Sequence, residues 1–373
     1  MIRVIKMKIL VNREQLSEAL SNLQRAVTPR SSLPILEGVL LSAETDRLTL
    51  MAYNMEISIK KELPIRCEKE GDVVISAKIL FDIIRKVNGD IIELSVDERQ
   101  VCHIKCGGSA FDILGMKSED FPEMPNVAEK DSITISSELL KDMVRQTIFA
   151  ISVKEETRPI LTGINFEVEN NEIKLVAING NCLAIRKAPI KYEGKINFVV
   201  SGRAIGEAVK IIGDKDEDIV INIGARNIAF DIDGYVMTSR LIEGNFIEYQ
   251  RSIPLSNKQE IRVNVPEFIE TLERISLVIL NDQTKTPIRF SMERDKILLT
   301  CSSSVGRSND VYETTLQGEE FEIGFSSKYL LDALKATESE EAIIRFNGSS
   351  AAAALYPVEG DEFLYLVMPM LLK

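Results

Sequence analysis

Apolar and polar positions recur along this chain in a pattern that repeats three times. Three segments each have a β-like run, a serine, and then apolar residues at helical spacing: VVISAKILFDIIRKV, FVVSGRAIGEAVKII and IGFSSKYLLDALKAT. The serines are Ser76, Ser201 and Ser326, so the same interval of 125 residues occurs twice. Each hydroxyl is placed to cap the first turn of its helix. The pattern therefore predicts three equivalent helices in three repeats.

A second predicted helix precedes each serine-led helix within its repeat. It begins near Arg13 in the first repeat, near Ser136 in the second, and near Val265 in the third, where Pro266 suits a first helical turn. A Pro-Ile pair then opens a predicted strand in every repeat, at Pro34-Ile35, Pro159-Ile160 and Pro287-Ile288.

Three short runs follow each serine-led helix, and several alternate apolar with polar residues, as in NIAFDI and AIIRFN. Alternation with a period of two indicates antiparallel strands with one covered face. The last run, FLYLVM, is the third such strand of the third repeat. We therefore expect an α+β fold of three repeated domains, each with two helices packed on antiparallel sheet. We place these domains at residues 7–130, 131–257 and 258–373.

Composition narrows the class of protein. The chain has 373 residues, of which 45% are hydrophobic and 27% charged, with a net charge of −12. No apolar run approaches the roughly 18 residues that span a membrane, and the opening residues lack the apolar segment of a secretory signal. We expect a cytoplasmic protein that does not bind membranes and whose five cysteines stay reduced.

Candidate catalytic chemistry is sparse. The only histidine, His103, lies between Cys102 and Cys106, and on a strand it would point away from both, which disfavours a metal site. Asp231 and Asp233 in FDIDG would share one strand face, which fits a metal-dependent enzyme acting on nucleic acid and equally fits a solvated hairpin end. We expect no catalytic residue, no metal and no cofactor.

Charge and local motifs point to a family. The six predicted helices together carry a slight positive charge although the whole chain is acidic, which would let a helical layer face nucleic acid without holding it tightly. The motifs are RSSLPIL, RPILTG, FIEYQRSIP, EIGFSSKYLLDAL and the terminal LVMPM. With these motifs in this order over residues 7–373, the chain resembles the bacterial DNA polymerase III β subunits, the β sliding clamps.

The resemblance implies the DNA clamp fold and a head-to-tail homodimer whose six domains form a ring around double-stranded DNA. Such a ring tethers a polymerase for processive synthesis and catalyses nothing itself. The resemblance places Arg30, Lys78 and Arg203 against the DNA backbone. Where clamps can carry Gln and Tyr near a second-domain loop, this chain has Glu155 and Ile160, so contact through that loop is an open question.

The resemblance also implies how the ring closes. Phe111 and Ile113, on an edge strand of the first domain, would meet Leu277 and Val278 at the end of a helix in the third domain of the other copy. An edge strand that continues a partner's sheet satisfies unpaired backbone groups. Ordinary core packing is the competing interpretation for all four residues.

A pocket between the second and third domains is the implied partner site. It would receive a short linear motif, Gln-Leu followed by an aromatic residue or leucine, from the DNA polymerase III α subunit, the clamp loader and repair polymerases. The residues assigned to it by position are Leu161, Gly163, Ile178, Asn181, Leu183, Ile247, Arg251, Ser326, Tyr329, Leu366, Met368 and Met370. Methionine suits a pocket that accepts several sequences. Plain core packing is the alternative for each apolar member.

This chain departs from the family pattern at three pocket positions. Asn181 and Cys182 replace a histidine and an arginine, and Ser252 replaces an apolar residue. We expect the pocket to keep its location with altered affinity or motif preference. A second overall function also fits the acidic sequence, namely a multidomain protein-binding scaffold that does not encircle DNA.

Overall fold

A computed structural model describes residues 4–128, 130–153, 158–213, 216–254, 256–279 and 286–372. The chain divides into two compact units. The first unit comprises Met1–Glu138 and Ala204–Leu241, and the second comprises Leu139–Arg203 and Ile242–Lys373.

The predicted repeat is confirmed by the order of elements. Each repeat reads strand, helix, four strands, helix, three strands within the described residues. The helices are α1 (Arg13–Leu23), α2 (Ala77–Lys86), α3 (Ser137–Arg145), α4 (Gly202–Ile211), α5 (Val265–Ser276) and α6 (Ser327–Thr337). Short 3-10 helices are η1 (Gln24–Ala26), η2 (Pro34–Glu37), η3 (Ser118–Asp120), η4 (Ile148–Ala150), η5 (Pro159–Thr162), η6 (Tyr249–Ser252) and η7 (Leu277–Ile279).

The first unit is built on one 12-stranded antiparallel sheet. Its main path runs β8-β7-β6-β1-β4-β16-β15-β14-β9, and β2, β3 and β5 branch from it. The long strand β4 joins the two repeats, because its start pairs with β16 and its end with β1. The strands are β1 (Ile5–Asn12), β2 (Gly38–Glu44), β3 (Arg47–Tyr53), β4 (Ile57–Lys69), β5 (Gly71–Ser76), β6 (Ile91–Asp97), β7 (Val101–Cys106), β8 (Ser109–Leu114), β9 (Asp131–Ser136), β14 (Asp218–Ile223), β15 (Asn227–Ile232) and β16 (Tyr235–Arg240).

The second unit contains two antiparallel sheets. The larger runs β13-β10-β11-β12-β24-β23-β22-β17, and the smaller runs β20-β19-β18-β21. The strands are β10 (Gly163–Glu169), β11 (Glu172–Ile178), β12 (Cys182–Pro189), β13 (Lys195–Ser201), β17 (Gln259–Asn264), β18 (Ile288–Met292), β19 (Lys296–Ser302), β20 (Arg307–Glu313), β21 (Phe321–Phe325), β22 (Glu341–Phe346), β23 (Ala353–Tyr356) and β24 (Phe363–Val367). The second repeat is divided between the units because its two halves continue the sheets of different neighbours.

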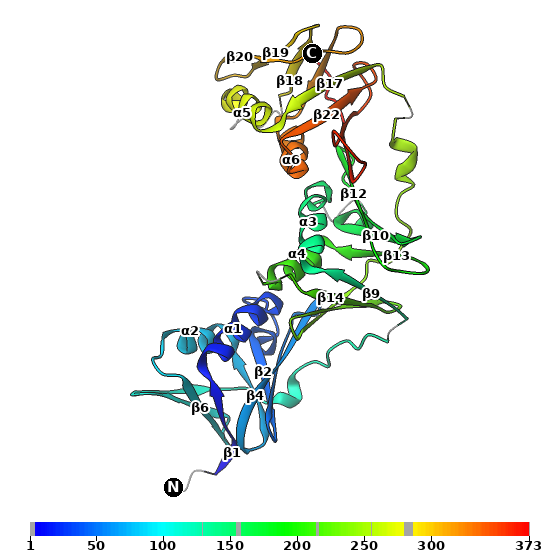
Figure 1. Ribbon diagram of the computed structural model, residues 1–373. Helices are drawn as coiled ribbons and strands as arrows, with labels where there is room; N and C mark the ends of the chain where they lie inside the picture. The colour runs from blue at the N-terminus through cyan, green and yellow to red at the C-terminus, as the bar shows by residue number, and fades with distance from the viewer. Residues whose placement is uncertain are drawn as a thin grey trace. The chain divides into compact units, whose positions relative to one another are not determined.

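Helices pack in pairs over these sheets. In the first unit α1 contacts α2, and in the second α5 contacts α6 (Figure 1). The side chains of Leu16, Leu20 and Leu23 on α1 are fully buried, as the helical spacing of apolar residues requires. Helix α1 therefore covers the sheet with one apolar face.

The predicted serine caps are wrong at two of three positions. Ser76 and Ser326 occupy the N-cap position, but neither side chain makes a capping hydrogen bond. Asparagines cap the other helix of each pair: the Asn12 side chain accepts hydrogen bonds from the backbone amides of the first turn of α1, and Asn264 does so for α5. Pro266 lies in the first turn of α5 as predicted.

Two of the three Pro-Ile pairs do not open a strand directly. Pro34 and Pro159 begin the short 3-10 helices η2 and η5, and the strands start only afterwards, at Gly38 and Gly163. Proline favours a first helical turn because its φ is fixed and it has no N–H to leave unpaired. In the third repeat, β18 does begin at Ile288.

Candidate peptide-binding groove and open strand edges

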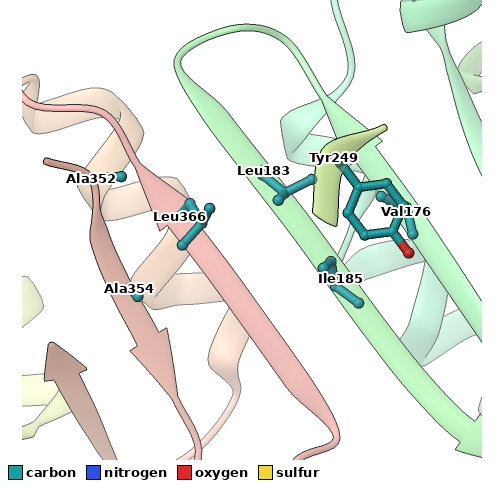
Figure 2. Close-up of a cluster of buried hydrophobic side chains, with 7 residues drawn as sticks. All are labelled: Val176, Leu183, Ile185, Tyr249, Ala352, Ala354 and Leu366. Carbon is teal, nitrogen blue, oxygen red and sulfur yellow. The ribbon is translucent and has the colours of Figure 1, made fainter. Parts of the chain in front are cut away.

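An apolar sheet face crosses the second unit from β11 to β23. Register places Ile178 opposite Leu183, Leu183 opposite Leu366, and Leu366 opposite Ala354, so these four side chains form one row. The buried cluster on this face comprises Val176, Leu183, Ile185, Tyr249, Ala352, Ala354 and Leu366, seen together in Figure 2. The face joins the second repeat to the third, because β12 and β24 are paired neighbours.

The segment containing η6 packs against part of this face. Phe246 and Ile253 are partly buried against the cluster, and Tyr249 is 3% exposed. The Tyr249 hydroxyl donates a hydrogen bond of 2.9 Å to Glu167. Burial, and then the Glu167 carboxylate, raises the pKa of Tyr249. Tyr249 is therefore a neutral donor that fixes this segment to β10.

Polar groups hold the rim of the face in place. The Asn181 side chain donates to the Tyr329 hydroxyl at 3.2 Å, and the Asn181 carbonyl accepts from the amide of Met368 at 2.8 Å. The Asn179 side chain accepts from the amides of Asn181 and Cys182 at 3.0 and 2.9 Å, which fixes the turn before β12. These bonds join the turn to α6 and to the C-terminal tail.

Six of the twelve predicted pocket residues lie on this face or its rim, namely Ile178, Asn181, Leu183, Tyr329, Leu366 and Met368. Leu183 and Leu366 are in the buried cluster, Ile178 packs against it, and the side chain of Met368, in the tail, is 45% exposed. Leu161, Ile247, Ser326, Tyr329 and Met370 are half-buried. Arg251 is exposed and paired with Glu248 at 2.7 Å.

Gly163 has a packing role. A Cβ there would lie 2.4 Å from the Val200 carbonyl oxygen, so the residue permits β10 and β13 to approach. Sequence reasoning missed several buried members of the face, namely Val176, Ile185, Tyr249, Ala352 and Ala354. The motif FIEYQRSIP contains Tyr249, but only the strand register brings the others together.

Strands β8 and β20 are two of the seven strands that have a paired neighbour on one side only within the described residues, the others being β5, β9, β13, β17 and β21. Strand β8 pairs only with β7, and β20 pairs only with β19. On β8, Phe111 is 38% and Leu114 is 75% exposed, while Ile113 is half-buried. Leu277, in η7, is 66% exposed, and Val278 beside it is half-buried.

The predicted DNA-facing cations are exposed. Arg30 lies in a turn with a φ of +59°, Lys78 lies in the first turn of α2, and Arg203 lies near the start of α4. Of the two loop positions noted earlier, Ile160 is half-buried and Glu155 lies outside the described residues.

His103 lies on β7, and the FDIDG segment spans the end of β15 and the turn that follows it. His103 is 5% exposed, and its Nδ1 lies 2.5 Å from the Asp112 carboxylate, which links β7 to β8. Asp233 lies in the turn between β15 and β16 with a positive φ, beside Gly234, so FDIDG is a hairpin end.

In the described ranges, no group of three or more His, Cys, Asp or Glu side chains could hold a metal ion. None of the five cysteines, all of which are described, forms a disulfide. None of the described helices is long and apolar enough to cross a membrane.

A three-repeat fold with an apolar face joining neighbouring repeats defines the class of the DNA clamps. Family models of the DNA polymerase III beta subunit match in order: the N-terminal domain at residues 7–125, the central domain at 134–248 and the C-terminal domain at 250–371. The chain therefore belongs to the DNA polymerase III beta subunit family, the beta sliding clamps of DNA replication.

Individual relatives agree along the whole length. The beta sliding clamp of Bacillus subtilis (strain 168) is 30% identical, with 98% of this chain and 99% of that protein covered. The crystal structure of the Bacillus subtilis DNA polymerase sliding clamp superimposes with a TM-score of 0.95 at 29% identity, covering 99% of this chain and 100% of that chain. The Bartonella birtlesii sliding clamp bound to griselimycin gives a TM-score of 0.92 at 31% identity, covering 98% and 100%.

Proposed function

We propose that two copies of this chain associate head-to-tail into a ring that encircles double-stranded DNA. The proposal rests on a regular pattern of strand pairing, in which the fourth strand of one repeat pairs with the last strand of the following repeat. The fourth strand of the first repeat, β4, pairs with β16, the last strand of the second repeat, and β12 pairs in the same way with β24. The equivalent third pair is β20 with β8, each of which has one edge unpaired within the described residues.

A second copy supplies the missing strand at each of these two edges. An unpaired edge strand with exposed apolar side chains favours association, because a partner strand pairs its backbone groups and covers its apolar surface. Phe111 and Ile113 of one copy would then contact Leu277 and Val278 of the other. Because the β20 edge and the β8 edge are different surfaces, two copies joined head-to-tail use both and form a closed assembly.

The ring would act by topology and not by chemistry. Encircled DNA is retained without tight binding, and Arg30, Lys78 and Arg203 would supply weak, salt-sensitive contacts to the phosphates. We propose a non-catalytic, cytoplasmic processivity factor with domains at residues 7–130, 131–257 and 258–373.

The apolar face in the second unit is the proposed partner site, here called the groove. Its apolar row and hydrogen-bonded rim suit a short linear motif, with apolar side chains buried and the peptide backbone held by polar groups. The partners we propose are the DNA polymerase III α subunit, the clamp loader and repair polymerases. The proposed rim contributors are Asn181, Arg251, Ser326 and Tyr329.

Two measurements test the ring. Light scattering across a dilution series should give a molar mass near twice the 41.8 kDa of one chain. Protein placed on circular duplex DNA by a bacterial clamp loader should stay bound and should be lost when the circle is cut. A monomer that binds circular and linear DNA alike, or neither, would favour the acidic protein-binding scaffold instead.

A further inference from the structure

The smaller sheet of the second unit carries a hollow, and two of its lining residues, Arg307 and Asn309, lie on β20, the strand proposed to close the ring. The hollow has a volume of about 760 Å³ and is bordered on one side by the C-terminal tail, Met370 to Leu372. Its polar lining includes Arg289, Thr300, Ser302, Arg307 and Asn309.

Strand register places these polar residues on one face of the sheet. Arg289 is opposite Thr300, and Thr300 is opposite Asn309, while Ser302 is opposite Arg307 in the next row. The two arginines are thus two strands apart and one row apart, which puts their Cα atoms about 12 Å from each other. Side chains of this length can approach one ligand from both sides.

The hollow is basic on an acidic protein. The chain carries a net charge of −12, yet no aspartate or glutamate is among the residues that line the hollow. The side chain of Arg307 is exposed and makes no hydrogen bond or ion pair within the described residues. Arg289 donates to Glu322 at 2.6 Å, and a guanidinium with five N–H donors can bind a second carboxylate beside the first.

The C-terminal tail connects the hollow to the groove. After Leu366 and Met368 it continues to Met370, whose amide donates to the Gly324 carbonyl at 2.8 Å. The tail lies this close because residue 324 has no side chain, and a Cβ there would be 2.6 Å from Leu372. Leu371 is 92% exposed at the border of the hollow. The tail therefore runs from the groove to the border of the hollow, the direction in which we propose that a flanking segment continues.

We propose that this arginine-lined hollow binds an acidic segment flanking the linear motif of a partner protein. The inference rests on the proposed role of the groove. Carboxylates suit the site because guanidinium groups bind them with paired, charge-assisted hydrogen bonds. The hydroxyls of Thr300 and Ser302 add neutral donors between the two charges.

The experiment compares synthetic peptides with a common core, Gln-Leu-Ser-Leu-Phe. Four peptides are made, with four aspartates or four serines added at the N-terminus or at the C-terminus of this core. Fluorescence anisotropy measures the affinity of each peptide for the protein at low and at physiological salt. We expect aspartates at one end to tighten binding about tenfold relative to serines. Arg307→Ser should abolish this gain and leave the affinity of the serine peptides unchanged.

Arg294→Ser is the matched control, because Arg294 is an exposed arginine of the same sheet in the turn between β18 and β19. The Arg294→Ser protein should still bind the aspartate peptides about tenfold more tightly than the serine peptides. If Arg294→Ser also abolishes this difference, the effect is general charge attraction and the proposal is overturned. Equal binding of all flanks would overturn it while leaving the groove intact. Failure of every peptide to bind would show that the groove proposal itself is wrong. If Arg307→Ser abolishes the dimer in light scattering, Arg307 serves ring closure and the hollow is not a binding site.

Discussion

Replacing Phe111 with alanine should weaken the association of two copies far more than it weakens the fold. Phe111 lies on the open edge strand β8 and is 38% exposed, which leaves about 75 Å² of a side chain of about 200 Å² for a partner to cover. At about 25 cal/mol per Å², burying that area contributes about 2 kcal/mol at each contact. A ring of two copies has two such contacts, so the loss of about 4 kcal/mol should raise the dissociation constant about a thousandfold.

Light scattering or sedimentation over a dilution series measures that constant directly. Leu33→Ala is the control, because Leu33 is 52% exposed in the same unit but lies on neither β8 nor β20. Thermal unfolding should be compared where both proteins are monomers, since association itself raises the melting temperature. A Phe111→Ala protein that dimerises as tightly as the wild type would refute the assignment of β8 to ring closure.

Three further predictions concern the groove and the sheets. Met368→Ala should weaken binding of the Gln-Leu-Ser-Leu-Phe peptide about fivefold to tenfold, because a 45% exposed side chain leaves the rim; the peptide titration checks this, and unfolding should be unchanged. Tyr249→Phe should lower the free energy of unfolding by about 2 kcal/mol, because the bond to the Glu167 carboxylate is lost; denaturant titration measures it. Hydrogen bonds, first from the Val101 amide, lower the pKa of Asp97, so its stabilising effect is present above about pH 4 and is lost as the pH falls through the lowered value. Thermal melts of Asp97→Asn should therefore fall below wild type at pH 7 and converge with it near pH 2.

Local pattern was sufficient for the elements of the fold. The interval between Ser76, Ser201 and Ser326 predicted equivalent helices, and α2, α4 and α6 start within one residue of these positions. The order of runs within the repeat likewise predicted the terminal strand, found as β24. These features depend on residues close together in sequence, where periodicity reports directly which side is covered.

The pairing of strands that lie far apart in the sequence could not be predicted from local pattern. Leu183 and Leu366 lie opposite each other on β12 and β24, yet nothing local to either strand names its partner. Ala352 and Ala354 are small residues whose place in the buried cluster follows only from that pairing. Residue type alone also did not predict which side chains cap the helices. Asn12 and Asn264 accept hydrogen bonds from the first turns of their helices, whereas Ser76 and Ser326 do not.

The departures from the family pattern acquire a physical meaning in the structure. Asn181 is committed to the rim through Tyr329 and Met368. Cys182, where the family segment has an arginine, is 3% exposed, and burial raises its pKa to about 12, so it presents a neutral thiol. The turn before β12 therefore stabilises the groove but offers no cation to a ligand. We therefore expect carboxylates of a bound peptide to pair with a cation elsewhere, and the cation we propose is Arg307, in the hollow that the tail borders.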